Sequence, residues 1–135
     1  MNESSLLKTA LVGNGLFSLM TGALLAIAPA TVGDWLGVSI DGWLRALGLA
    51  LLAHGVVLLW AAQRPDPTGW GRLNLAMIAP YPVMMIVLAV TSLVEPSGGK
   101  VLVLADGLVV GVFAVMHALA LRPASGTRSV AAAAR

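Results

Sequence analysis

Four long apolar stretches constrain this chain more than any other feature of its sequence. Residues 9–33, 46–63 and 73–94 contain no Asp, Glu, Lys or Arg, and residues 101–121 carry Asp106 as their single acidic or basic side chain besides a histidine. Each stretch is close to the ~20 residues that cross a hydrocarbon layer of about 30 Å. Backbone groups in lipid are satisfied in helices or closed barrels, and none of the stretches alternates like a barrel strand. We therefore expect transmembrane helices.

The composition agrees with a lipid environment. Of the 135 residues, 59% are hydrophobic and 10% are charged, against roughly 25% charged in an average soluble protein. We predict an all-α fold, an integral membrane four-helix antiparallel bundle over residues 1–122, followed by a flexible cytoplasmic tail at 123–135. The lipid bilayer is then the first expected partner. The predicted helices are 5–28, 43–62, 70–94 and 101–121.

The basic residues are distributed unevenly between the two ends of these helices. Because Lys and Arg concentrate in cytoplasmic loops, we expect a multi-pass protein of the bacterial plasma (inner) membrane with both termini in the cytoplasm. Lys8, the apolar run after it and Ala26-Ile27-Ala28 imitate a signal peptide with its cleavage site, but the apolar run is too long, so we expect this segment to be retained. The side with the termini holds Lys8, Arg64, Arg72, Arg122, Arg128 and Arg135, and the other side holds Arg45 and Lys100.

Several classes of chemistry have no support in the sequence. There is no cysteine, which excludes disulfides, thiolate nucleophiles and Cys-ligated zinc. The eight basic residues are too few and too scattered for a nucleic-acid interface. Glycine-rich phosphate loops, HExxH, serine elbows and carboxylate pairs within helical reach are also missing. We therefore assign no catalytic residue, no metal site and no cofactor, and we lean against an enzyme.

Small residues recur at intervals of three and four along three of the predicted helices. Such faces let helix backbones approach closely, which drives helix association in lipid. We interpret them as packing faces within the chain. The alternative is that a face such as the GxxxG motif at 107–111 forms a homo-oligomer or binds another membrane protein. The residues are Gly15, Ser18, Gly22 and Ala26, then Ala46, Ala50 and Ala53, then Gly107, Gly111, Ala114 and Ala118.

Asp106 is the most costly residue to place in a membrane, because an ionisable side chain in hydrocarbon costs ~2.5–3.5 kcal/mol on insertion scales. It lies about five residues inside the outer end of the fourth predicted helix, and Arg45 enters the second helix from the same side. We therefore expect an Asp106–Arg45 ion pair. A proton or cation site, or a carboxyl that is protonated or hydrated, are the alternatives.

Two histidines and an asparagine are also predicted inside the membrane. Asn14 and His54 lie at similar depth, so we expect them to share a hydrogen bond. A proton relay and a metal or haem ligand are the alternatives for His54. His117 shares the face of Asp106 three turns away but is predicted nearer the cytoplasm than His54. His54 and His117 are thus weak candidates for cofactor binding, and this depth difference disfavours one haem held between them.

The third predicted helix contains Pro80, Tyr81 and Pro82 in its middle. The two prolines remove amide donors and leave the carbonyls of Ala76 and Ile78 unpaired, which predicts a kink. Neighbouring helices and Asn74 could accommodate such a kink. Alternatively, a broken helix at membrane depth can bind an ion or substrate, with the Tyr81 hydroxyl as a further ligand.

The first half of the chain carries a family resemblance. The segment 14–22 (NGLFSLMTG), Pro29, the segment 35–37 (WLG) and the segment 44–51 (LRALGLAL) resemble a pattern in small bacterial four-helix membrane proteins of unassigned role, similar in size and layout to the DoxX-like group. The prolines of the third helix depart from that pattern. The resemblance implies an inner-membrane bundle and transfers no catalytic residue.

Three functions follow from these features, in order of preference. The first is a non-enzymatic accessory or assembly subunit that acts through helix packing. The second is a transporter or channel for a small solute or proton, using the kinked third helix with Asp106 and His54. The third is a haem-binding redox subunit with His54 or His117 as an axial ligand.

Overall fold

The computed structural model describes residues 3–91 and 97–122, and the described part of the chain is all helical. The predicted tail at 123–135 and the predicted end of the third helix at 92–94 lie outside the described residues. The helices are α1 (Glu3–Ile27), α2 (Pro29–Leu36), α3 (Asp41–Ala62), α4 (Thr68–Ile78), α5 (Tyr81–Val90) and α6 (Ser97–Ala120).

Four helices in the described residues are long and apolar enough to cross a membrane, as the sequence predicts. Three of them are parts of α1, α3 and α6. The third in chain order combines α4 and α5, which continue in one direction across a break. The candidate spans are Ser4–Ile27, Asp41–Ala62, Thr68–Val90 and Gly98–Ala120.

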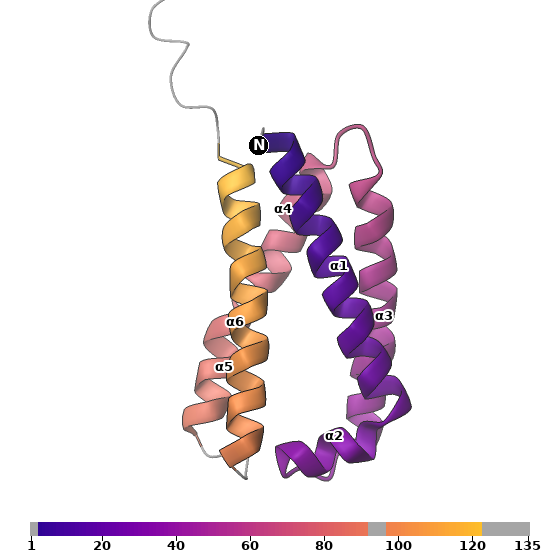
Figure 1. The fold of residues 1–135 in the computed structure, drawn as a ribbon, viewed down its shortest axis with the longest axis vertical. Coiled ribbons are helices and arrows are strands. Elements are labelled where there is room, and N and C mark those ends of the chain that lie inside the picture. Colours follow the sequence, from indigo (N-terminus) through magenta and orange to yellow (C-terminus); the bar gives the residue numbers. More distant parts are fainter. Residues whose placement is uncertain (1–2, 92–96, 123–135) are drawn as a thin grey trace, which may run out of the picture.

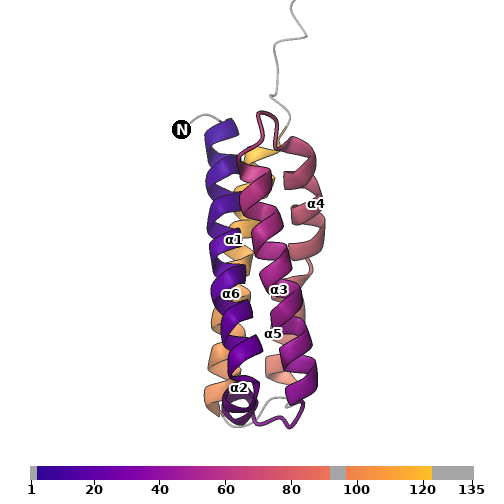
Figure 2. The same ribbon diagram turned by 90° about the vertical axis from the view of Figure 1, so that its right-hand side faces the viewer.

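The helices run up and down along one axis (Figure 1). The beginning of α1, the turn between α3 and α4, and the end of α6 lie at one end, which we call the terminal end. Helix α2 lies across the opposite end, which we call the α2 end. A view turned by 90° shows α1 and α3 side by side in front, with α6, α4 and α5 behind them (Figure 2).

Glycines bring α1 and α3 into backbone contact. A methyl group on Gly48 would lie 2.5 Å from the Ala26 nitrogen and 2.7 Å from the Gly22 oxygen. One on Gly55 would lie 2.7 Å from the Gly15 oxygen. Such distances leave no room for any side chain, so the two helices touch through their main chains. We call this contact, made by Gly15, Gly22, Gly48 and Gly55, the glycine seam.

The structure corrects the packing face predicted for α3. Ala46, Ala50 and Ala53 are exposed in the chain, whereas Gly48 and Gly55 are buried against α1. Both sets recur with helical spacing, but they lie on different faces of the helix. Gly15, Ser18 and Gly22 are buried, and Ala26 is half-buried.

The GxxxG motif of α6 packs against α5 of the same chain. A methyl group on Gly107 would lie 2.7 Å from the Met85 Cβ atom, and one on Gly111 would lie 3.4 Å from the Pro82 Cγ atom. Ala114 is half-buried beside this contact and Ala118 is exposed. Pro82 of the third span therefore lies where α6 offers its smallest residues.

The helix breaks where the Pro-Tyr-Pro sequence predicts it. Helix α4 ends at Ile78, and α5 begins at Tyr81 with Pro82 in its first turn. Proline is tolerated in a first turn because its missing amide would have no helical partner there. Because of the break, the axis of α5 need not continue that of α4. Tyr81, at the start of α5, is half-buried and contacts Asp106 of α6.

Two apolar clusters close the interior near its two ends. At the terminal end, Leu7, Leu11, Leu58, Ala62 and Ala120 form a buried cluster from α1, α3 and α6. At the α2 end, Leu25, Val32 and Leu44 are buried together, with Leu36 and Leu51 packed against them.

Candidate functional site

Asn74 joins polar side chains from three other helices. It lies on α4 and is 2% exposed. Its Oδ1 accepts a hydrogen bond from Asn14 Nδ2 at 3.3 Å and lies 3.0 Å from His54 Nε2. Its Nδ2 lies 3.1 Å from His117 Nε2. One amide thus connects α1, α3 and α6, and we call Asn14, His54, Asn74 and His117 the polar network.

The donors in this network assign the histidine tautomers. Because Asn74 Oδ1 can only accept, His54 Nε2 must carry a hydrogen. Because Asn74 Nδ2 can only donate, His117 Nε2 must accept. His117 Nδ1 then donates to the Phe113 carbonyl oxygen at 2.8 Å. The His117 ring is therefore neutral in this arrangement, and every hydrogen bond has one donor and one acceptor.

The network differs from the predicted Asn14–His54 pair. Both side chains bond to Asn74 Oδ1, so the sequence prediction of a direct hydrogen bond is corrected by an intermediate residue. Asn74 also connects His54 and His117, which lie at different depths. Its amide oxygen contacts His54 and its amide nitrogen contacts His117. The sequence offered one signal for this role, which is an asparagine in an otherwise apolar helix.

Asp106 binds Tyr81 instead of the predicted Arg45. The Tyr81 hydroxyl donates to Asp106 Oδ2 at 2.6 Å. Arg45 follows the buried Leu44 by one residue, about 100° around α3, and its side chain is exposed. The two residues share an end of the molecule but not a face, which explains why the predicted ion pair is absent from the described residues.

A cavity of about 150 Å³ lies between the polar network and the Tyr81–Asp106 pair. We call it the polar cavity. Helices α1, α3, α4, α5 and α6 all contribute to its wall, which includes Asn14 and His54 from the network and both members of the pair. The lining residues are Asn14, Phe17, Ser18, Thr21, Leu47, Leu51, His54, Met77, Ile78, Tyr81, Asp106 and Val110.

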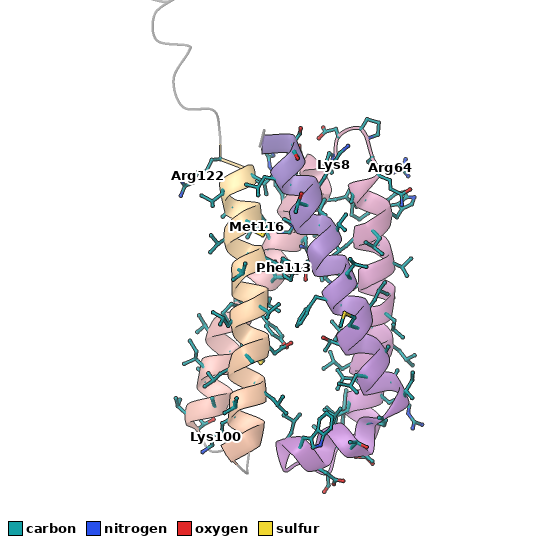
Figure 3. The ribbon with its side chains drawn as sticks, in the orientation of Figure 1. Lys8, Arg64, Lys100, Phe113, Met116 and Arg122 are labelled. Atoms are coloured by element: carbon teal, nitrogen blue, oxygen red, sulfur yellow. The ribbon has the colours of Figure 1, made fainter. Side chains whose placement is uncertain are left out.

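Phe113 fills the space next to this cavity. It lies in the half of α6 nearer the terminal end (Figure 3), where Gly13 of α1 leaves room for its ring. A methyl group on Gly13 would be 2.7 Å from the Phe113 Cε1 atom. The ring also packs against Phe17, with 6.2 Å between the centroids. The cavity residues Asp106 and Val110 lie on the α2 side of Phe113 along the same helix.

A second hollow has a different character. It is an open groove of about 740 Å³, and its walls from α5 and α6 carry no ionisable side chain. Its lining includes Pro82, Met85, Gly107 and Gly111. Of the two hollows, the polar cavity is therefore the one that brings together groups able to bind or transfer charge.

The described residues do not fit the cofactor alternatives well. Both ring nitrogens of His117 already take part in hydrogen bonds. The polar cavity beside His54 is smaller than the ~300–1,000 Å³ pockets that hold drug-sized ligands, and a haem is larger than those ligands. Among the described residues, no three His, Asp or Glu side chains are close enough to hold a metal ion.

Comparison with known proteins finds no relative: no family model, no curated protein and no solved structure matches the chain. The resemblance to DoxX-like proteins stays a prediction.

Proposed function

We propose that this chain is an integral protein of the bacterial plasma membrane, in which an antiparallel four-helix bundle crosses the bilayer with both termini in the cytoplasm. Many large apolar side chains on the candidate spans are exposed. Met20, Leu108 and Val90, for example, each have an exposed fraction of 70% or more. Lys8, Arg64 and Arg122 gather at the terminal end, opposite Lys100 (Figure 3). This asymmetry supports a cytoplasmic terminal end.

Within that membrane frame, we propose that the chain moves a small solute or a proton across the bilayer. The polar cavity carries this proposal, because it brings Asp106, Tyr81 and His54 to one partly open space inside the candidate spans. Ionisable residues at such depth are costly and typically mark ion or substrate paths. A broken helix beside such a site is the arrangement used by many transporters.

The apolar clusters at the two ends of the molecule indicate which parts would have to move during transport. Leu11 and Leu58 lie between the polar network and the terminal end, and Leu25 and Leu44 lie between the polar cavity and the α2 end. Apolar residues thus lie between the cavity and both ends of the molecule, whereas the cavity is partly open at its side. Transport then requires these clusters to open in turn, and the break between α4 and α5 is the natural hinge.

Flux through reconstituted vesicles tests the proposal. We expect wild-type protein in liposomes to dissipate an imposed proton or solute gradient faster than empty liposomes. Asp106→Asn should reduce the rate to the leak of empty liposomes, because the substitution keeps the shape but removes the charge. The exposed Asp34 of α2 provides a matched control, and Asp34→Asn should leave the rate unchanged. Equal rates for wild type and Asp106→Asn would contradict the proposal.

A second candidate function is supported by the exposed alanines of α3. Ala46, Ala50 and Ala53 form a small-residue face that no helix of the described chain covers. Such a face in a membrane allows close approach of another helix, either from a second copy or from another membrane protein. This favours the accessory-subunit hypothesis. Native mass measurement in mild detergent should then show a complex for wild type and its loss in Ala50→Leu, with Val56→Leu, at another exposed position of α3, as the control.

A further inference from the structure

We infer that the ligand of the polar cavity is a small organic cation, a protonated amine of up to about six non-hydrogen atoms, held by Asp106. This inference rests on the proposed transport function and names its substrate class. Three properties of the cavity carry it, namely the charge, the size and the composition of the wall.

The charge of the wall favours a cation. Among the described residues that line the cavity, Asp106 is the one acidic side chain and none is Lys or Arg. Tyr81 donates to Asp106 Oδ2, and Asp106 Oδ1 has no hydrogen-bond partner among the described residues. A carboxylate at this depth in a candidate membrane span is stabilised by a partner of opposite charge. The remaining titratable side chains at the wall are His54, whose Nε2 is taken up by Asn74 Oδ1, and Tyr81 itself.

The size of the cavity favours small ligands. A dry cavity of about 150 Å³ in another protein holds one benzene molecule, which has six non-hydrogen atoms. The polar cavity has about the same volume. Methylamine, butylamine and molecules of similar bulk therefore fit within it, whereas a drug-sized cation would extend beyond it.

The composition of the wall favours an organic cation over a metal ion. Ca²⁺ and similar hard cations require about six or more oxygen ligands, and most of this wall is carbon. Leu47, Leu51 and Ile78 offer apolar contact to an alkyl group. Phe17 and Tyr81 add aromatic rings, which attract ammonium groups when desolvated. An alkylammonium ion can thus contact the Asp106 carboxylate with its charged group and the apolar side chains with its alkyl group.

Thermal unfolding of the full chain in nanodiscs tests the inference with defined probes. We expect butylammonium chloride to raise the unfolding temperature in a saturable way. Butanol, which has nearly the same shape without the charge, should not do so, and neither should sodium chloride. Asp106→Asn should weaken butylammonium binding by at least about tenfold. Asp34→Asn should bind as wild type does, since Asp34 is exposed on α2.

Each result decides the inference. Equal shifts with butylammonium and butanol, or unchanged binding in Asp106→Asn, would overturn it. If Asp106→Asn does not fold, the wild-type comparison of butylammonium with butanol still decides, and Thr21→Leu, which fills the cavity without touching the charge, should abolish the shift. Proton flux that depends on Asp106 without any amine binding would overturn the inference and leave the proposed function standing. Amine binding without flux would support the inferred ligand and contradict the proposed transport function.

Discussion

The contact between α1 and α3 and the contact of α1 with α4 and α6 are built in opposite ways. The glycine seam joins main chains directly, and Gly22 and Gly48 leave no space between them. On the other side of α1, Asn14 meets Asn74 through a side-chain hydrogen bond, and the polar cavity opens beside it. One helix therefore has a rigid face and a polar face. The comparison teaches that close backbone packing gives a fixed frame, whereas a polar contact leaves room for a ligand.

The largest effect is expected from breaking the glycine seam. Gly48→Leu places a bulky side chain where even a methyl group would lie 2.5 Å from the Ala26 nitrogen. Overpacking of this kind should lower the free energy of unfolding by more than about 3 kcal/mol. Gly42→Leu, on the same helix with nothing within 4 Å, is the matched control and should be tolerated. Denaturation in detergent followed by circular dichroism measures both, and equal stability of the two variants would refute the seam.

A smaller loss is expected from removing the hub of the polar network. Asn74→Ala leaves Asn14, His54 and His117 without their shared partner. With roughly 0.6–1.7 kcal/mol for each such bond in a membrane protein, we expect a loss of about 2 kcal/mol in unfolding free energy. Gln63→Ala removes an amide at an exposed position and should cost much less. The same denaturation assay checks this, and a loss no greater than that of Gln63→Ala would show that the network is not structural.

Removing the Tyr81 hydroxyl should have a small effect on the unfolding free energy and a clear effect on the flux rate. Tyr81→Phe deletes the donor to Asp106 Oδ2 and keeps the ring. We expect a loss of about 1 kcal/mol in unfolding free energy together with a clear change in the flux rate, because Tyr81 touches the cavity. Thr91→Val deletes a hydroxyl that, among the described residues, donates to carbonyls of its own helix at the α2 end, and it should leave flux unchanged. Unchanged flux in Tyr81→Phe would remove the residue from the site.

The smallest effect is expected outside both contacts, in the turn before α4. The pKa of Asp66 lies below its ordinary value because the Thr68 side chain and backbone donate hydrogen bonds to the carboxylate. This contribution to stability is present above the pKa of the unfolded chain and is lost as the pH falls through the lower folded pKa. Wild type should therefore lose a little more stability on acidification than Asp66→Asn. Identical pH profiles for the two proteins would show that the turn contributes nothing.

The sequence predicts the helices well because their cause is local. Apolar length defined the four candidate spans, and the two prolines located the break between α4 and α5. The segment between the first two predicted helices contains the short helix α2, which has a proline in its first turn. Each of these features depends on neighbouring residues along the chain, which a single sequence contains.

The partners of the polar residues could not be predicted in the same way. Depth in a helix follows from residue number, but the rotation of one helix against another depends on packing across the whole molecule. Arg45 has a suitable depth for Asp106 and points outward, whereas Tyr81 reaches it because the proline break reorients α5. In α3, the alanines and the glycines both recur with helical spacing. The glycines face α1 because only a residue without a side chain fits against the α1 backbone there.

The most direct test of the central claim, a polar cavity inside the membrane, uses the absence of native cysteines. Ser18→Cys introduces a thiol of similar size into the cavity wall, and Leu108→Cys places one on the exposed face of α6. Because the thiolate is the reactive form, a cysteine facing lipid should be inert. We predict that 2-aminoethyl methanethiosulfonate labels the cysteine at position 18 in reconstituted vesicles, that butylammonium slows the labelling, and that the cysteine at position 108 stays unlabelled. Labelling at position 108 with none at position 18 would contradict the account.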